Sequence, residues 1–296
     1  MAAAGPGGAG VRQARVRRSR RTLVAALACA AIAAACGGGS GRSGAAPSAE
    51  PPVRPGPGPA HFATLPPGAT LPSGAQCASW IRAAAPLPET KRVNLAANRT
   101  TGHHLTADPF DARSDDRRAN AQVAPRVDGG FTGTTWQVLR WAACKWGIDE
   151  DLAYAQGAQE SWRRQPSLGD YQPDAAACPP GHGLGADGRP GQCPQSYGVL
   201  QDRYPFLRSS WPGIARSTAM SADTAYAVWR ACFEGYERWL GTADRGQPYA
   251  PGDAWGCIGR WVSGRWHTPP AEKYIASVRG LLQRRVWEQP DFRELG

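Results

Sequence analysis

The sequence lacks the cysteine and histidine spacings that hold zinc. None of its eight cysteines forms a CxxC pair or lies at zinc-ligand spacing from a histidine, so we expect no metal site and no cofactor. The adjacent His103 and His104 are more typical of a loop than of a ligand set. No internal repeat is visible, and no alternating apolar pattern exceeds a few residues, which disfavours an all-β fold.

Acidic residues are absent from the first 35 positions, which contain six arginines: Arg12, Arg15, Arg17, Arg18, Arg20 and Arg21. These six account for much of the formal net charge of +10. Without them, 28 basic and 24 acidic residues remain, a net charge of +4. Such a mildly basic chain, with no basic stripe beyond its leader, disfavours a nucleic-acid partner and is compatible with an anionic cell wall.

An apolar run from Leu23 to Ala35 follows these arginines. It is too short to span a membrane and is apolar on every helical face, which is typical of a secretory signal peptide over residues 1–35. The segment Ser19-Arg20-Arg21-Thr22-Leu23 also resembles a twin-arginine export signal, so the general and the twin-arginine routes both stay open.

The end of this run, Ala33-Ala34-Ala35-Cys36, precedes a Gly/Ser tract and resembles the lipobox of bacterial lipoproteins of the actinobacterial type. Ala33 departs from the leucine usual there. Two outcomes therefore stay open: a lipid anchor at Cys36, or plain cleavage after Ala35. Either places the protein outside the cytoplasm, held at the membrane by the lipid or released into the cell wall.

Six further cysteines favour disulfides, because an even number in an exported chain is typical of a disulfide framework. Cys178 and Cys193 flank a segment rich in Pro, Gly and Asp, and we expect them to staple it. Of the remaining pairings, we favour Cys77–Cys144 and Cys232–Cys257.

Composition divides the rest of the chain into three parts. Residues 36–75 are rich in Pro and Gly and predict a disordered, flexible linker. Residues 76–128 have a weak pattern and predict an N-terminal arm pinned by Cys77. Residues 129–290 carry helical periodicity and predict a mainly α domain with a long loop between Trp162 and Arg203. We expect helices over 134–146, 152–163, 221–240 and 270–287.

Local signals place the ends of these helices. Gly147 ends the first, Asp149 is the N-cap of the second, and Ser221 that of the third. Tryptophans at helical spacing, Trp136, Trp141, Trp229 and Trp239, are expected in the core.

Glu160 is the last residue on one face of the predicted second helix, and the apolar Leu152 is the first. Leu152, Ala155, Gln156, Gln159 and Glu160 follow the i, i+3, i+4, i+7, i+8 spacing and therefore share one face. A carboxylate on such a face is a local conflict, and conflicts of this kind tend to mark functional sites. A solvated glutamate at a frayed helix end is the alternative.

Four motifs in order resemble the SLT-type lytic transglycosylase domain of the lysozyme-like superfamily, over about residues 130 to 288. They are Gln159-Glu160-Ser161-Trp162, the segment Gln195 to Gln201, the Gly- and Trp-rich segment 255–266, and Pro270 to Tyr274. The resemblance implies a lysozyme-like helical fold. Leu200 stands in place of a methionine, and the segment 261–264 lacks the usual tyrosine and asparagine.

Carried over by position, the resemblance implies that Glu160 is the catalytic acid/base. Ser161 would support it or the bound sugar, and Tyr274 would reach in from the last helix. Tyr197, Gly198 and Gln201 would line the floor of the cleft. Apolar walls of the cleft could come from Trp162 and from three tryptophans in a Gly-rich segment, Trp255, Trp261 and Trp266. For these three, which we expect to lie in a loop, packing in the core is equally expected. Of the three, we assign Trp261 to substrate binding.

The resemblance implies cleavage of the β-1,4 MurNAc-GlcNAc bonds of peptidoglycan. We expect the protein to act as a monomer on the glycan strands. A single glutamate suffices for the non-hydrolytic route to a 1,6-anhydro product, which we favour. Hydrolysis needs a second carboxylate, for which Asp170 and Asp174 are candidates. Their loop setting favours solvated or turn-forming roles over catalysis. A glycan-binding protein without turnover is the third possibility.

Overall fold

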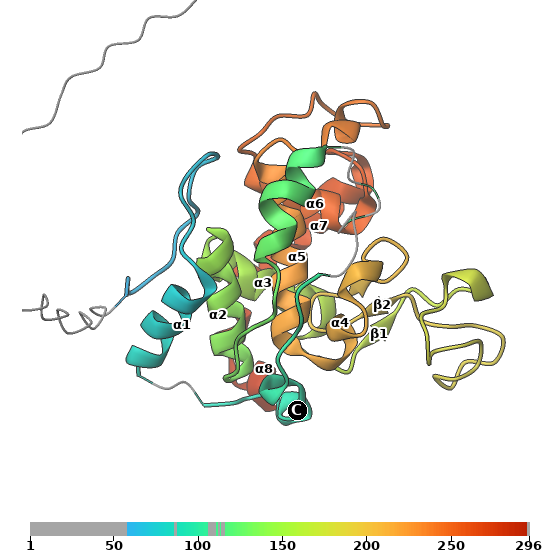
Figure 1. The fold of residues 1–296 in the computed structure, drawn as a ribbon, viewed down its shortest axis with the longest axis horizontal. Coiled ribbons are helices and arrows are strands. Elements are labelled where there is room, and N and C mark those ends of the chain that lie inside the picture. Colours follow the sequence, from blue (N-terminus) through green and yellow to red (C-terminus); the bar gives the residue numbers. More distant parts are fainter. Residues whose placement is uncertain (1–57, 86–87, 106–110, 112, 114–115, 295–296) are drawn as a thin grey trace, which may run out of the picture. The chain divides into compact units, whose positions relative to one another are not determined.

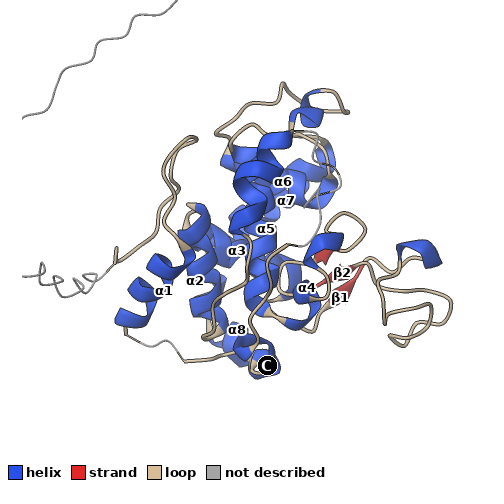
Figure 2. Cartoon of the chain, viewed as in Figure 1, coloured by secondary structure: helices blue, strands red, loops and turns tan. Residues whose placement is uncertain are grey.

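The computed structural model describes residues 58–85, 88–105, 111, 113 and 116–294. The predicted signal peptide and the lipid-anchor candidate Cys36 lie outside these residues. Within them the fold is mainly helical (Figure 2), as the sequence predicts.

Helix α5 (Thr218–Phe233) is the centre of the fold, and all of its 16 residues are buried. Its neighbours surround it (Figure 1): it contacts α2 (Thr135–Trp146), α4 (Gly213–Arg216) and α6 (Ala254–Ser263). Helix α3 (Glu150–Ser161) contacts both α2 and α7 (Pro269–Gln283). The outer helices are α1 (Gly74–Ala83), which packs on α2, and the short α8 (Pro290–Glu294).

A small antiparallel sheet lies beside the helices, with strand order β1-β2-β3. Its strands have two residues each: β1 (Leu168–Gly169), β2 (Ser196–Tyr197) and β3 (Asp202–Arg203). Tyr197 of β2 pairs with Leu168 on one side and Asp202 on the other. The long segment between β1 and β2 projects away from the helices (Figure 1). It forms the middle of the predicted loop between Trp162 and Arg203, but that range also contains the three strands.

Two of the predicted helix ends are confirmed. Gly147 ends α2 in the left-handed conformation, and the Asp149 carboxylate caps α3 by accepting the N–H groups of Asp151 and Leu152. The Thr134 side chain adds a capping box at the start of α2.

The predicted bounds of the third helix are wrong. Ser217, not Ser221, caps α5 by accepting the N–H of Met220, and α5 ends at Phe233 instead of Leu240. Gly235 has φ +80°, a conformation that turns the chain out of the helix, and residues 238–241 form a separate 3-10 turn.

The Gly-rich segment around Trp255 is a helix, not the expected loop. Asp253 caps α6 by accepting the N–H of Gly256. A Cβ on Gly256 would clash with the Trp266 ring, and one on Gly259 would lie 2.8 Å from Ile275 of α7. These glycines therefore serve close packing between elements, so their low helix propensity is overridden.

The predicted flexible linker over 36–75 is wrong for its last part, because residues 58–73 pack on the helical domain. Phe62 is only 7% exposed, belongs to the hydrophobic core and stacks on Trp80. Arg230 of α5 donates to the carbonyls of Leu65 and Pro66. A buried aromatic residue and hydrogen bonds to backbone carbonyls thus attach a Pro-rich segment that composition alone describes as a tether.

All three predicted disulfides are present: Cys77–Cys144, Cys178–Cys193 and Cys232–Cys257. The first joins α1 to α2, the second staples the projecting loop, and the third joins α5 to α6. Three disulfides fit an oxidising compartment outside the cytoplasm. Among the residues described, no helix combines the length and apolar character needed to cross a bilayer.

The substitution Phe62→Ala tests whether residues 58–73 belong to the folded domain. Because Phe62 is buried against Trp80, we expect it to lower the free energy of unfolding by about 3 kcal/mol, measured by urea denaturation. Leu184→Ala, in the projecting loop with Leu184 45% exposed, is the control and should change it by less than about 0.5 kcal/mol. Equal, small effects of the two substitutions would contradict the packing of Phe62 against Trp80.

Candidate active site

A cleft of about 540 Å³ brings together residues from the end of α3, the small sheet and the end of α6. Glu160 lines it, together with Gly169 of β1 and Asp170 after it, Gln201 before β3 and Trp261 of α6. Four segments that are distant in the sequence therefore meet around one carboxyl group.

Glu160 lies in the last turn of α3. The helix ends directly after it because Trp162 and Arg163 both adopt positive φ, 55° and 60°, and the backbone N–H groups of both return to carbonyls of the last turn. The side chain of Glu160 borders the cleft while protein atoms enclose its other sides. Helix termination thus places this carboxyl at the boundary between the protein interior and the cleft.

Burial raises the pKa of Glu160 from its ordinary value of 4.5 to about 8. Loss of hydration is the largest cause, since it disfavours the charged form. A hydrogen bond from Tyr274 opposes the rise, and the negative charge of Asp170 adds to it. At pH 7 the group is therefore mostly a neutral carboxylic acid that can donate a proton.

Tyr274 reaches Glu160 from α7, as the sequence predicts. Its hydroxyl donates to Oε1 of Glu160 and is also hydrogen-bonded by the side chain of Gln156, one turn earlier on α3. Burial raises the pKa of the Tyr274 hydroxyl well above 10, so it remains a donor. The Glu160 carboxyl is thus fixed between two helices and keeps a donor ready for its anionic form.

Ser161 and Gly198 support the site and do not line the cleft. The Ser161 hydroxyl donates to the carbonyl of Val199 at 2.8 Å and accepts the N–H of Arg164 at 3.0 Å, which ties α3 to the turn after β2. Gly198 has φ +84°, and a Cβ there would lie 2.7 Å from the carbonyl oxygen of Ile214. Only glycine fits that turn.

Gln201 lines the cleft in a strained backbone conformation, φ 55°. Its amide donates to the carbonyls of Ser167 at 3.1 Å and Gly198 at 3.0 Å. These hydrogen bonds hold the segment before β1 against the turn between β2 and β3. The Gln201 side chain therefore helps to fix the backbone that forms the cleft floor.

Tyr197 does not lie where the resemblance implies. It is 1% exposed, its hydroxyl donates to the carbonyl of Pro194 at 2.8 Å, and its ring packs edge-on against His182 and Trp211. The register of β2 explains this, because Ser196 lines the cleft and the next side chain along a strand points to the opposite face.

The tryptophans are distributed differently from the prediction. Trp261 lines the cleft and donates to the carbonyl of Leu200 at 3.0 Å, whereas Trp266 is fully buried. Trp239, expected in the core, lies on the 3-10 turn after α5 and lines the cleft. Trp162, expected as an apolar wall, packs instead on Phe292 of α8, since the left-handed end of α3 turns it away.

Asp170, the candidate second carboxylate, lines the same cleft as Glu160. It has φ 50°, its side chain is 55% exposed, and Oδ2 accepts the Ser196 hydroxyl at 2.6 Å. Asp174, the other candidate, lies outside the cleft lining and caps a 3-10 turn by accepting the N–H of Ala176.

Sequence reasoning missed Asp202. Its side chain is completely buried, Oδ2 accepts the Ser221 hydroxyl, and burial raises its pKa well above 3.8. The charge of Glu160 raises the pKa of Asp202 further. A carboxyl group immediately after Gln201, at the start of a short strand, carries no distinctive spacing signal.

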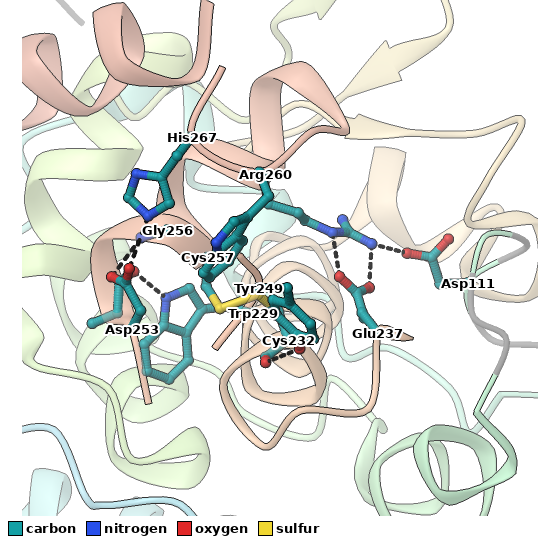
Figure 3. Close-up of a disulfide and its surroundings, with 12 residues drawn as sticks. Asp111, Trp229, Cys232, Glu237, Tyr249, Asp253, Gly256, Cys257, Arg260 and His267 are labelled. Carbon is teal, nitrogen blue, oxygen red and sulfur yellow. Dashed lines mark hydrogen bonds and ion pairs between the residues drawn. A yellow bond between two sulfur atoms is a disulfide. The ribbon is translucent and has the colours of Figure 1, made fainter. Parts of the chain in front are cut away.

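Arginines on the cleft lining were also missed: Arg113, Arg203 and Arg265. Arg113 comes from the predicted N-terminal arm, whose weak pattern gave no reason to place it near Glu160. Its neighbour Asp111 accepts a hydrogen bond from Arg260 of α6 at 2.7 Å, and Arg260 also donates to Glu237 (Figure 3). This buried group attaches the arm to α6.

No protein-family model, curated protein or solved structure matches the chain.

The raised pKa of Glu160 predicts a pH-dependent stability difference between the wild type and Glu160→Gln. The wild-type carboxyl contributes stability fully below pH 4.5, its unfolded-state pKa, and this contribution is lost as pH rises toward about 8. The free energy of unfolding of the variant, relative to that of the wild type, should therefore rise by up to about 1.4 kcal/mol per pH unit across that range. Thermal unfolding at pH 4.5, 6 and 8 measures the difference.

Glu288→Gln is the control for this comparison, because Glu288 is 52% exposed and the change of side chain is the same. We expect its difference from the wild type to change much less with pH than that of Glu160→Gln, because the Glu288 side chain remains exposed to water, paired there with Arg285. A constant difference for Glu160→Gln would contradict the desolvation of Glu160.

Proposed function

We propose that this protein cleaves the β-1,4 MurNAc-GlcNAc bonds of peptidoglycan, with Glu160 as general acid/base. The observation that carries the proposal is a carboxyl group that borders a cleft, has a pKa of about 8 and is held by Tyr274. A glycosidic oxygen leaves poorly unless it is protonated, so the reaction needs an acid that is neutral near pH 7. The order of sequence motifs supports the same class of reaction.

The first step breaks the bond between the sugar C1 and the bridging oxygen. Glu160 donates its proton to that oxygen, which leaves as a hydroxyl, while positive charge develops at C1. The carboxylate that results accepts the hydrogen bond from Tyr274. Tyr274 therefore stabilises the charge that Glu160 acquires during the step, and so favours proton release.

The second step needs no water in the favoured route. The Glu160 carboxylate accepts the proton of the sugar's own 6-hydroxyl as O6 bonds to C1, which gives a 1,6-anhydro product and restores the acid. One carboxyl group performs both transfers. Trp261 and Trp239 supply aromatic faces in the cleft on which sugar rings can pack.

Hydrolysis is the second candidate, and the position of Asp170 on the same cleft favours it. As a carboxylate, Asp170 could activate water or act as the nucleophile. Asp170 has a strained, positive-φ backbone conformation, and its side chain accepts a hydrogen bond from the Ser196 hydroxyl. Backbone strain of this kind is often retained at functional sites.

The cellular setting proposed is the outer side of the membrane or the cell wall, with Cys36 as a lipid anchor. The three disulfides fit this setting, since exported proteins keep them oxidised. The protein is proposed to act as a monomer on glycan strands.

Digestion of purified peptidoglycan tests the role of Glu160. Glu160→Gln keeps the shape of the side chain but cannot donate a proton as an acid, so we expect cleavage to fall by about 10²- to 10⁴-fold. Mass spectrometry of the products should show 1,6-anhydro ends for the wild type. If both the wild type and Glu160→Gln bind the glycan and neither cleaves it, the protein is a glycan-binding protein and not an enzyme.

The substitution Asp170→Asn separates the two routes. In the non-hydrolytic route the variant should retain activity within about tenfold, with the same anhydro products. A loss as large as that of Glu160→Gln, together with reducing ends in the wild-type products, would establish hydrolysis through Asp170 instead.

A further inference from the structure

The cleft around Glu160 contains a row of three arginines, Arg113, Arg203 and Arg265, referred to as the arginine row. They come from three separate parts of the chain: the segment before α2, strand β3 and the turn after α6. The proposed acid chemistry at Glu160 uses none of them. Arg113 shares one contacting residue with Arg203 and another with Arg265, so the three belong to one stretch of the cleft wall.

Phe206 joins the first two members of the row. The guanidinium carbon of Arg113 lies 4.3 Å from the centre of its ring, and that of Arg203 lies 5.4 Å from it. Stacking on an aromatic ring fixes a guanidinium group while leaving N–H groups at its edge for a ligand.

Gly264 joins Arg113 to Arg265. Nη1 of Arg113 would lie 3.5 Å from a Cβ at Gly264, and Arg265 donates to the Gly264 carbonyl at 2.9 Å. Gly264 also has φ +60° as the left-handed end of α6, so the backbone turn brings the third arginine to the cleft.

The positive charge of the row is only partly balanced by the protein. The Asp111 carboxylate accepts hydrogen bonds from Nε and Nη2 of Arg113, at 3.2 and 3.3 Å. Arg203 forms a long ion pair with Asp170, at 3.8 Å and too far for a direct hydrogen bond. Its Nη2 donates to Gln195 at 3.1 Å, and its buried Nε has no hydrogen-bond partner among the described residues. Arg265 is exposed. Glu160, the other carboxyl on the cleft, is mostly neutral at pH 7.

We propose that the arginine row binds a carboxylate group of the glycan, so that the substrate class is an acidic glycan and not a neutral one. This inference rests on the proposed function, whose cleft it shares. Guanidinium groups match carboxylates through paired N–H donors, and charge-assisted bonds of this kind are stronger than neutral ones. A neutral glycan would leave the remaining positive charge of the row unbalanced, and selectivity for the acidic form follows.

The experiment measures binding without turnover, in the Glu160→Gln background. The probes are muramyl glycan oligomers prepared from peptidoglycan, with their carboxylates free or converted to methylamides, titrated by calorimetry. We expect the free acid to bind about tenfold more tightly than the amide. Added Arg203→Gln or Arg265→Gln should remove most of this preference, mainly by weakening binding of the free acid.

Arg284→Gln is the matched control, because it removes the same charge from an exposed arginine at the far end of α7. It should retain the tenfold preference, and unchanged thermal unfolding checks that each variant folds. Equal affinities for acid and amide, or a preference that survives both cleft substitutions, would overturn the carboxylate site while leaving the glycan reaction intact. Binding of neither probe would instead overturn the proposed function, and this inference with it.

Discussion

The hydrogen bond between Tyr274 and Glu160 is the interaction on which the candidate site depends. It joins α3 to α7 at the point where α3 ends, and it places a donor against a carboxyl group that burial keeps largely protonated. The two effects act in opposite directions on the pKa of Glu160. Burial makes the group an acid near neutral pH, and Tyr274 limits the free energy needed to ionise it when the proton leaves.

The packing of the other helices determines where Tyr274 lies. Gly259 allows α6 to approach α7 closely, since a Cβ there would meet Ile275 and Ala271. The Cys232–Cys257 disulfide attaches α6 to α5 (Figure 3), and α5 is buried throughout. The position of Tyr274 relative to Glu160 is therefore set by the core and not by a flexible loop.

A second buried group attaches the outer segments to the same frame. Arg260 on α6 is fully buried and bonds both Glu237, before the 3-10 turn that carries Trp239, and Asp111, beside Arg113. Separating these charges would leave an uncompensated ion in the interior, which is costly. Two residues on the cleft lining, Trp239 and Arg113, thus depend on a charge cluster behind it.

The sequence by itself predicted those features that local chemistry specifies. Asp149 and Gly147 define helix ends because capping depends on a few neighbouring backbone groups, and the cysteines flanking the 178–193 loop are paired as expected. Glu160 and Tyr274 were both predicted as site residues, and the structure brings them into contact.

Only the tertiary structure decided which side chains reach the cleft. Tyr197 is turned into the interior by strand register, Phe62 attaches a segment that composition describes as a tether, and glycines that disfavour a helix serve the contacts of α6. The arginine row is assembled from three distant segments by Phe206 and Gly264, with no spacing in the sequence to indicate it. Capping depends on neighbours along the chain, whereas these placements depend on burial and close approach between segments that meet only after folding.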